Sequence, residues 1–181
     1  MSNNSWYQVL VSEQGVGPAI SNTTTPTSVL LGQAKYVLAA NWFEAAGKKL
    51  RVKAHGKIST AASTPGTLTL DIRFGSTVVF NGGASGTLAT SATNLTWDFE
   101  ADLVVQAVGS GTTATVLGVG RLLTAALSAT TPIMLLPVSA PAAGSGFDST
   151  TSFAIDMFAT WSAASASNSI QVTDYELASL N

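Results

Sequence analysis

The sequence contains no cysteine and only one histidine, His55. The missing thiols exclude disulfides, cysteine-ligated zinc, iron–sulfur clusters and thiol catalysis, and a single imidazole excludes a histidine-rich metal site. The one loose dinucleotide fingerprint, residues 109–114, lacks the βαβ context that such a motif requires. No serine lies in a nucleophile elbow. We therefore expect no cofactor, no metal ion, no catalytic residue and no enzyme activity.

Charge is also scarce. Asp, Glu, Lys and Arg make up 10% of the chain, against about 25% in an average soluble domain. The net charge of −2 gives no bulk attraction to nucleic acid. Residues 1–20 contain no basic residue and no apolar run of signal-peptide length, so we expect no secretory signal. The longest uncharged stretch, residues 122–147, is interrupted by prolines and glycines, which argues against a membrane helix.

Alternation with a period of two dominates the rest of the chain, which is typical of half-buried strands. Eight to ten such segments are separated by turn signals, and none has a sustained helical period. This pattern predicts an all-β fold: an antiparallel two-sheet sandwich, jelly-roll-like, with about 8–10 strands. The expected strands cover residues 6–11, 49–58, 67–74, 78–80, 95–105, 113–123, 133–136, 153–161 and 169–177.

Shared parity within each strand also predicts a core. The expected buried side chains are Leu50, Val52, Leu68, Leu70, Ile72, Trp97, Phe99, Leu103, Phe153, Ile155, Met157 and Trp161. Two local features depart from the alternation. Residues 41–49 are the best helical candidate, about one turn, because Asn41 and Glu44 have the spacing of a capping box. Residues 81–83, Asn-Gly-Gly, predict a tight turn after a short strand.

The first 28 residues predict an extended N-terminal arm, followed by one sandwich domain over residues 29–181. The polar stretch 21–28, SNTTTPTS, separates the arm's apolar residues from the domain. An arm of this composition orders only on contact with a partner. Its expected anchors are Trp6, Tyr7, Val9 and Leu10.

Two strands carry opposite charge on one face each. Lys49, Arg51, Lys53 and Lys57 project from the strand 49–58 together with His55, and Asp98, Glu100 and Asp102 project from 95–105. The basic strip is either a solvated face or a contact for a protein or a polyanion, and the carboxylates are alternatively a calcium site. Because three aligned carboxylates need compensation, we expect the two strips to pair with each other. Charge reversal at Arg51 and Lys53 is then expected to destabilise the free protein or its oligomer.

The segment 41–59, NWFEAAGKKLRVKAHGKIS, resembles part of the virion proteins of tailed bacteriophages. In those proteins an N-[WF]-[WF] turn leads through a glycine into a basic strand and a G-x-[IV]-[ST] end. Segments 64–70 and 159–170 are similar too. The resemblance covers most of the chain after about residue 30 and leaves the first 28 residues outside.

The resemblance implies a non-enzymatic structural protein of a phage particle. The expected role is a capsid cement or decoration protein, made in the host cytoplasm and located on the capsid surface, where it stabilises the head. Its expected partners are the major capsid protein and itself, as a homotrimer, with no nucleic acid and no membrane. The alternative is a tail or baseplate module that binds a host receptor or glycan. The small residues in the loops 61–66, 82–86 and 140–146 argue mildly against that alternative.

Overall fold

A computed structural model describes residues 6–127 and 131–180, and its regular secondary structure consists of strands and one short 3₁₀ turn. Within these ranges, no helix has the length and apolarity needed to cross a membrane. The elements are β1 (Tyr7–Glu13), β2 (Ile20–Ser21), β3 (Thr27–Ser28), η1 (Gly32–Ala34), β4 (Val37–Leu38), β5 (Lys49–Ser59), β6 (Leu68–Phe74), β7 (Thr77–Ala84), β8 (Leu95–Ala107), β9 (Thr115–Thr124), β10 (Ile133–Leu136), β11 (Phe153–Trp161) and β12 (Ser169–Leu180).

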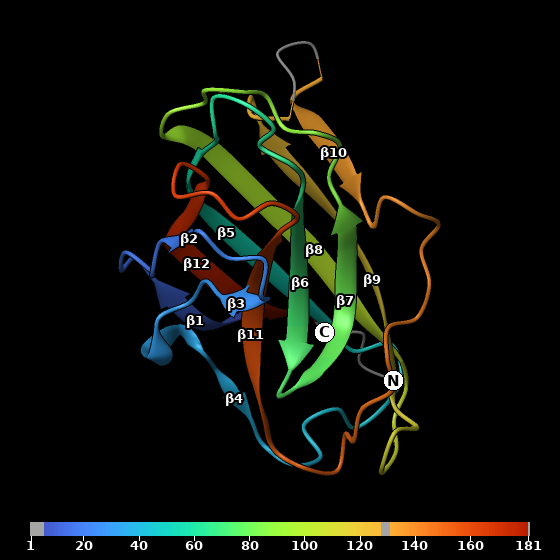
Figure 1. The fold of residues 1–181 in the computed structure, drawn as a ribbon. Coiled ribbons are helices and arrows are strands. Elements are labelled where there is room, and N and C mark those ends of the chain that lie inside the picture. The colour runs from blue at the N-terminus through green and yellow to red at the C-terminus, as the bar shows by residue number, and fades with distance from the viewer. Residues whose placement is uncertain (1–5, 128–130, 181) are drawn as a thin grey trace.

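The strands form two antiparallel sheets that pack face to face, as a jelly-roll-like sandwich (Figure 1). The seven-stranded sheet has the order β1-β12-β5-β8-β9-β10, with β2 also paired to β12. The five-stranded sheet has the order β3-β11-β6-β7, with β4 also paired to β11. In Figure 1 the smaller sheet lies in front of the larger one. The predicted fold class is therefore confirmed.

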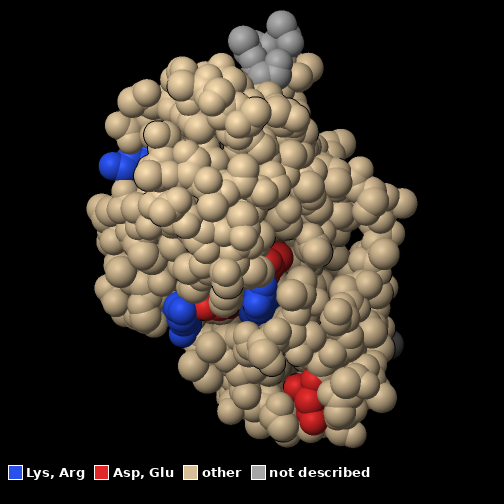
Figure 2. Space-filling view, viewed as in Figure 1, with Lys and Arg blue, Asp and Glu red and all other residues tan. Residues whose placement is uncertain are grey.

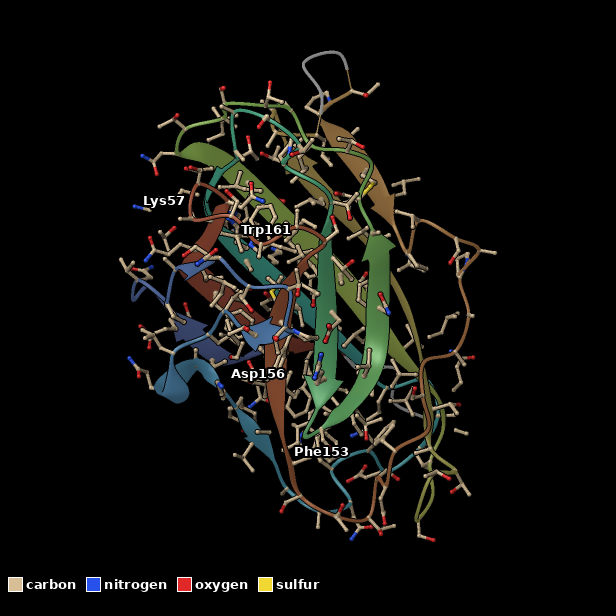
Figure 3. The ribbon with its side chains drawn as sticks, in the orientation of Figure 1. Lys57, Phe153, Asp156 and Trp161 are labelled. Atoms are coloured by element: carbon tan, nitrogen blue, oxygen red, sulfur yellow. The ribbon has the colours of Figure 1, made fainter. Side chains whose placement is uncertain are left out.

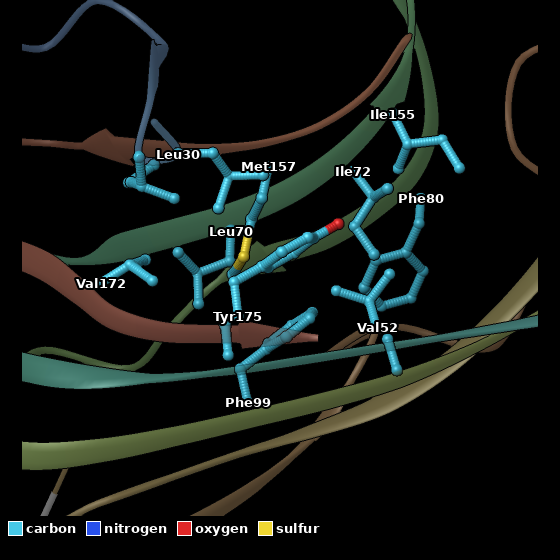
Figure 4. Packing of buried hydrophobic residues seen from close by; sticks show 14 of the residues in the cluster. Leu30, Val52, Leu70, Ile72, Phe80, Phe99, Ile155, Met157, Val172 and Tyr175 are labelled. Carbon is cyan, nitrogen blue, oxygen red and sulfur yellow. The ribbon is translucent and has the colours of Figure 1, made fainter. Parts of the chain in front are cut away.

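The core fills the space between the sheets. Eleven of the twelve side chains predicted to be buried are buried, and the exception, Phe153, is half-buried against the core. Figure 4 shows how side chains of both sheets meet, with the Tyr175 ring of β12 lying between Met157 and Phe99. The indole of Trp97 donates hydrogen bonds to the carbonyls of Lys57 and Gln171, both at 3.2 Å. Because the inner residues of β5 and β8 are anchored in the core in this way, the residues that alternate with them face outward.

The helix predicted for residues 41–49 is wrong. This segment forms turns, and Asn41 has a φ of 58°, which is left-handed and unlike the extended backbone of a helix N-cap. The Phe43 side chain is buried among Phe74, Phe147 and Phe153, with ring centroids about 6 Å apart. Tertiary packing of this aromatic ring therefore outweighs the capping-box pattern.

The turn predicted at residues 81–83 is also wrong. β7 continues through these residues, and Asp71 pairs with Asn81 whereas Thr69 pairs with Ala84. The extra residue forms a β-bulge, in which Gly83 has a φ of 78°. The tight connection lies instead at Gly75, φ 59°, between β6 and β7. The glycines of the predicted turn therefore serve a bulge, where the same backbone freedom is needed.

Residues 7–28 do not form an extended arm in this structure. β1 pairs with β12, β2 extends that pairing, and β3 pairs with β11, so the segment contributes strands to both sheets. Its polar stretch crosses from one sheet to the other. Ile20 is buried in the core, and its carbonyl accepts a hydrogen bond from the Trp161 indole at 3.1 Å. The segment resembles an arm in sequence because its strands are short and gain their stability from pairing.

Candidate functional site

Charge is concentrated on the outer face of the seven-stranded sheet. β5 and β8 are neighbours in register, so that Arg51 lies opposite Asp102, Lys53 opposite Glu100 and His55 opposite Asp98. On the flanking strands, Arg121 lies opposite Glu100 and Glu176 opposite Lys53. We call this set the charged ladder. Its members are Lys49, Arg51, Lys53, His55, Lys57, Asp98, Glu100, Asp102, Arg121, Asp174 and Glu176.

Arg51 and Asp102 form the best-defined pair of the charged ladder. Arg51 Nε donates to Asp102 Oδ1 at 2.8 Å, and Nη2 donates to Oδ2 at 3.1 Å. Lys49 Nζ lies 2.5 Å from Asp102 Oδ2, and Arg51 Nε lies 3.6 Å from Glu100 Oε1. His55 Nδ1 lies 3.1 Å from Asp98 Oδ2. The predicted pairing of the basic and acidic strips is thus confirmed, within one sheet of one chain.

The pKa values of this pair reflect the contact. Partial burial opposes ionisation of Asp102, but hydrogen bonds from Arg51 and Lys49 outweigh it and hold the pKa of Asp102 below its ordinary value. The same hydrogen bond raises the pKa of Arg51, against the desolvation that would lower it. Both groups are therefore charged throughout the neutral range.

Other ladder members are less engaged. Arg121 Nη2 donates to Glu100 Oε2 at 3.2 Å, yet half of the Arg121 side chain is exposed. Glu176 accepts a hydrogen bond from the Tyr7 hydroxyl, and this bond raises the pKa of Tyr7. Within the described residues, Lys53, Lys57 and Asp174 have no ion-pair partner. Figure 3 shows Lys57 projecting away from the sandwich.

Exposed apolar side chains lie at both margins of this sheet. The β9–β10 patch consists of Val119, Leu123, Ile133 and Leu135, and Leu135 is 74% exposed. The β1 patch consists of Trp6, Tyr7 and Val9, and Trp6 is 62% exposed. Leu10, the fourth anchor predicted for this segment, is instead half-buried against the core. Three of the four side chains predicted as anchors are thus available at β1, whereas no pattern in the sequence indicates the β9–β10 patch.

A hollow of about 200 Å³ lies where the charged ladder meets the β9–β10 patch. Glu100, Asp102 and Arg121 line its polar side, and Val119, Gly120 and Leu135 line the remainder. The hollow therefore offers an apolar wall beside a guanidinium, which suits an aromatic side chain better than a small ion.

The opposite face of the sandwich is nearly free of charge (Figure 2). In the part of the chain that the structure describes, the ion pairs of this face lie at β6 and β11. Arg73 binds Asp71 through two hydrogen bonds of 2.6 and 3.2 Å, and Lys35 Nζ lies 2.8 Å from Asp156. Asp156, labelled in Figure 3, also accepts a hydrogen bond from the Ser28 hydroxyl at 2.7 Å. The contacts of Asp156 with Lys35 and Ser28 fasten the segment around β3 and η1 to β11, which is a structural role.

The larger cleft, of about 320 Å³, lies between β7, β9 and the loop after β10. Two of the residues that line it, Asn81 and Ser139, have polar side chains. The other lining residues are Val79, Phe80, Gly83, Gly118, Pro137, Ala140, Ala142, Ala143 and Gly144. None of these side chains titrates near neutral pH. The cleft therefore offers hydrogen bonds and apolar contact, without a general acid or base.

The carboxylates of β8 do not converge on a cation site. Asp98, Glu100 and Asp102 each contact a cationic or imidazole side chain of β5. Within residues 6–127 and 131–180, no group of three or more potential ligands is arranged to hold a metal ion. The calcium alternative therefore has no geometric support at this face.

Comparisons with known proteins give a limited likeness. No family model matches the chain, and no curated protein matches it. Among solved structures, the CBM2 module of the evolved Dit of Lactobacillus casei BL23 phage J-1 has a TM-score of 0.41 and 8% identity, covering 98% of this chain and 97% of that one. Peanut lectin in complex with a 9mer peptide has a TM-score of 0.40 and 7% identity, covering 98% and 99%. Winged bean acidic lectin has a TM-score of 0.29 and 9% identity, covering 98% and 92%. At such scores we draw no functional argument from these likenesses.

Proposed function

We propose that this chain is a non-enzymatic structural protein of a bacteriophage particle. It covers the head as a cement or decoration protein, packs there beside further copies of itself, and has the major capsid protein as its partner. The location is the capsid surface, where the contact stabilises the head. The proposal combines the sequence resemblance with one structural observation, the outer face of the seven-stranded sheet.

That face has the chemistry of a protein contact. Five basic and five acidic residues alternate across the charged ladder, so the face holds many charges but little net charge. Where a protein partner covers the ion pairs of Arg51 with Asp102 and of Arg121 with Glu100, it meets paired charges, which limits the desolvation penalty that isolated charges would cause. A partner would also bury the exposed apolar side chains at both margins. Such burial stabilises a complex by about 25 cal/mol per Å² of apolar surface removed from water.

The same balance argues against a nucleic acid partner. Neutralising phosphates requires an excess of Lys and Arg on one surface. Here Arg51 lies opposite Asp102, Lys53 opposite Glu100 and Arg121 opposite Glu100, so the face has no excess of cations. Likewise, the lack of titratable side chains in the larger cleft supports a binding or structural role over catalysis.

The proposal is tested by binding of purified protein to heads prepared from a phage whose copy of this gene has been deleted. Thr96→Arg places a bulky charge on the exposed outer face of β8. Thr160→Arg makes the same change on β11, at a position of outer parity on the opposite face, and is the matched control. We expect Thr96→Arg to weaken cosedimentation with heads at least tenfold and Thr160→Arg to leave it near wild type. Equal binding by both variants would contradict docking through this face.

A second candidate is a tail or baseplate module that binds a host receptor or glycan, and the larger cleft favours it. Asn81 and Ser139 present polar groups there beside the Phe80 edge of the core. Glycan-array binding that is lost in Ser139→Trp, which fills the cleft, would favour this function. Binding that is unaffected by Ser139→Trp would not involve the cleft.

A further inference from the structure

Two apolar patches lie at opposite margins of one sheet, and the described chain covers neither of them. β1 ends the seven-stranded sheet on one side and β10 ends it on the other. Trp6 and Tyr7 are at least half exposed in the β1 patch, as are Ile133 and Leu135 in the β9–β10 patch. Exposed apolar patches of this kind mark interaction sites. Two such sites on one chain require either two different partners or one partner that satisfies both.

We propose that the two patches bind each other between copies of this chain. The β1 patch of one copy contacts the β9–β10 patch of the next, and repetition of this contact closes a ring of three or more copies. A contact between two different patches is head-to-tail, and it closes into a ring when the rotation between copies permits. The inference rests on the proposed function, because it names a second copy as the partner at the margins of that same sheet.

The twist of the sheet makes this geometry possible. Neighbouring strands are rotated by roughly 20–25° relative to one another, always in the same sense. Between β1 and β10 the rotation accumulates over the whole strand order, so outer-face side chains at the two margins point in different directions. The patches therefore face sideways from the charged ladder. Neighbouring copies contact the two margins and the hollow beside Glu100 and Asp102, and the remainder of the charged ladder stays available to the shell.

The hollow beside Leu135 receives the aromatic anchor. It is lined by Val119 and Leu135 on one side, and on the other by the half-exposed Arg121 with the carboxylates of Glu100 and Asp102. An indole placed there contacts both aliphatic side chains and stacks on the guanidinium, an arrangement favoured by cation–π attraction. Trp6 of the neighbouring copy is the most exposed aromatic side chain among the described residues. Tryptophan and arginine are also the residues that most often dominate the binding energy of an interface.

The charges at the two margins are complementary. Beside the β1 patch, Glu176 of β12 accepts a hydrogen bond from Tyr7, lies opposite Lys53 of β5, and among the described residues has no ion-pair partner. Beside the β9–β10 patch lies Arg121, with half of its side chain in solvent. A head-to-tail contact brings Glu176 of one copy towards Arg121 of the next, which also contacts Glu100 of its own chain. A contact of either patch with its own kind would instead bring like charges together, which is unfavourable.

The first part of the test is the mass of the purified chain by light scattering, over a concentration series reaching tens of micromolar. We expect wild type to have at least three times the 18.5 kDa of one chain. Trp6→Asp disables the β1 patch, Leu135→Asp disables the β9–β10 patch, and both are expected to reduce the mass to that of a single chain. Val37→Asp is the matched control, because Val37 is 60% exposed but lies on β4 of the other sheet. Val9→Asp and Ile133→Asp serve as second variants of the two patches.

The second part mixes the two disabled variants. In a head-to-tail arrangement the intact β1 patch of Leu135→Asp still binds the intact β9–β10 patch of Trp6→Asp, and the assembly then stops. We therefore expect the equimolar mixture to have twice the mass of one chain, although each variant alone is monomeric. A contact of one patch with its own kind gives a different result, because one of the two variants then assembles alone.

Each remaining outcome overturns the ring. A wild-type mass of one or two chains, assembly by either disabled variant alone, or a mixture that stays monomeric would each contradict it. Loss of assembly in Val37→Asp would place the contact elsewhere. These measurements use only purified protein, so the ring can fail while the chain still docks on phage heads. Conversely, docking can fail while the ring forms in solution.

Discussion

Arg51 and Asp102, on the neighbouring strands β5 and β8, are joined by two parallel hydrogen bonds of 2.8 and 3.1 Å. The pair lies at the centre of the charged ladder, and Lys49 contributes a second cation to the same carboxylate. Fork-to-fork contacts of this kind are more specific than single ion pairs, because both planar groups must align. The pair therefore fixes the register of β5 against β8 on the solvent side, as Trp97 does on the core side.

Charge reversal tests this pairing. Arg51→Asp places a third carboxylate beside Asp102 and Glu100, and we expect it to lower the free energy of unfolding by about 1 kcal/mol, since a cross-strand pair is worth roughly 0.2–1 kcal/mol and like charges are repulsive. The double variant Arg51→Asp with Asp102→Arg is expected to recover most of the loss. Urea unfolding of wild type, the two single variants Arg51→Asp and Asp102→Arg, and the double variant measures the coupling energy between the two side chains. If the double variant were as unstable as the sum of the single ones, the pair would have no coupling energy.

Acid stability follows from the pKa of Asp102. Folding lowers this pKa below its ordinary value of 3.8, so ionised Asp102 contributes stability above that pH. The contribution is lost as the pH falls through the lowered pKa of the folded state. We expect Asp102→Asn to be less stable than wild type at pH 7 and to show a smaller further loss between pH 5 and pH 2, in a series of thermal melts. Parallel curves for the two proteins across that range would contradict this assignment.

The environment of Tyr175 predicts that removing its hydroxyl group does not lower the stability of the protein. Its ring is buried between the sheets (Figure 4), and within the described part of the chain its hydroxyl has no hydrogen-bond partner. Burial raises the pKa of Tyr175, so the group stays neutral. Leaving a buried hydroxyl unpaired costs about 1–3 kcal/mol. We therefore expect Tyr175→Phe to leave the unfolding free energy unchanged or raise it.

The control for that substitution is Leu70→Ala, at a neighbouring buried position. It should cost about 2–5 kcal/mol, because it removes apolar contacts and leaves a cavity. Chemical unfolding of both variants gives the comparison. A loss above about 1 kcal/mol in Tyr175→Phe, the size of one net hydrogen bond, would mean that its hydroxyl has a partner such as a bound water molecule.

Deleting residues 1–13 distinguishes a strand from an arm. β1 pairs with β12 over most of its length, so the deletion leaves the β12 edge unpaired and removes the β1 patch. We expect a lower melting temperature, and faster hydrogen–deuterium exchange of the backbone amides in residues 175–180. An arm that orders only on a partner would leave both quantities unchanged in the free protein.

The fold is predictable from sequence where alternation is clean. In β5 and β8, every outer position except Val104 is polar or charged and almost every inner one is apolar, so parity alone identifies both the core residues and the charged ladder. Their adjacency is predictable as well, because the three carboxylates of β8 need cations and β5 carries the only basic cluster of the sequence.

Other features depend on contacts that no local pattern encodes. Lys35 and Asp156 are far apart in the sequence, and their ion pair exists only because the segment around η1 crosses β11. Asn168 is fully buried in a polar loop. Its side chain accepts a hydrogen bond from the Ala61 amide and donates to the carbonyls of Pro65 and Ala163. Backbone groups contribute no sequence signal, so nothing in the sequence indicates this link between loops.

The β9–β10 patch is hidden from sequence reasoning for a related cause. An apolar run such as residues 133–136 ordinarily predicts burial. Ile133 and Leu135 are exposed because they have the outer parity of β10, on the sheet face that no second layer covers, whereas Leu136 of the inner parity is buried. Strand order is a property of the whole fold, and a local pattern of residues does not determine it.

The proposed role as a structural protein of the phage head is tested most directly by the copy number of this chain on purified particles. Quantitative mass spectrometry of such particles, with gold-labelled antibody to locate the chain, gives both number and position. We predict labelling over the head and a copy number on the scale of the major capsid protein. A few copies per particle, labelled at the tail, would contradict that role.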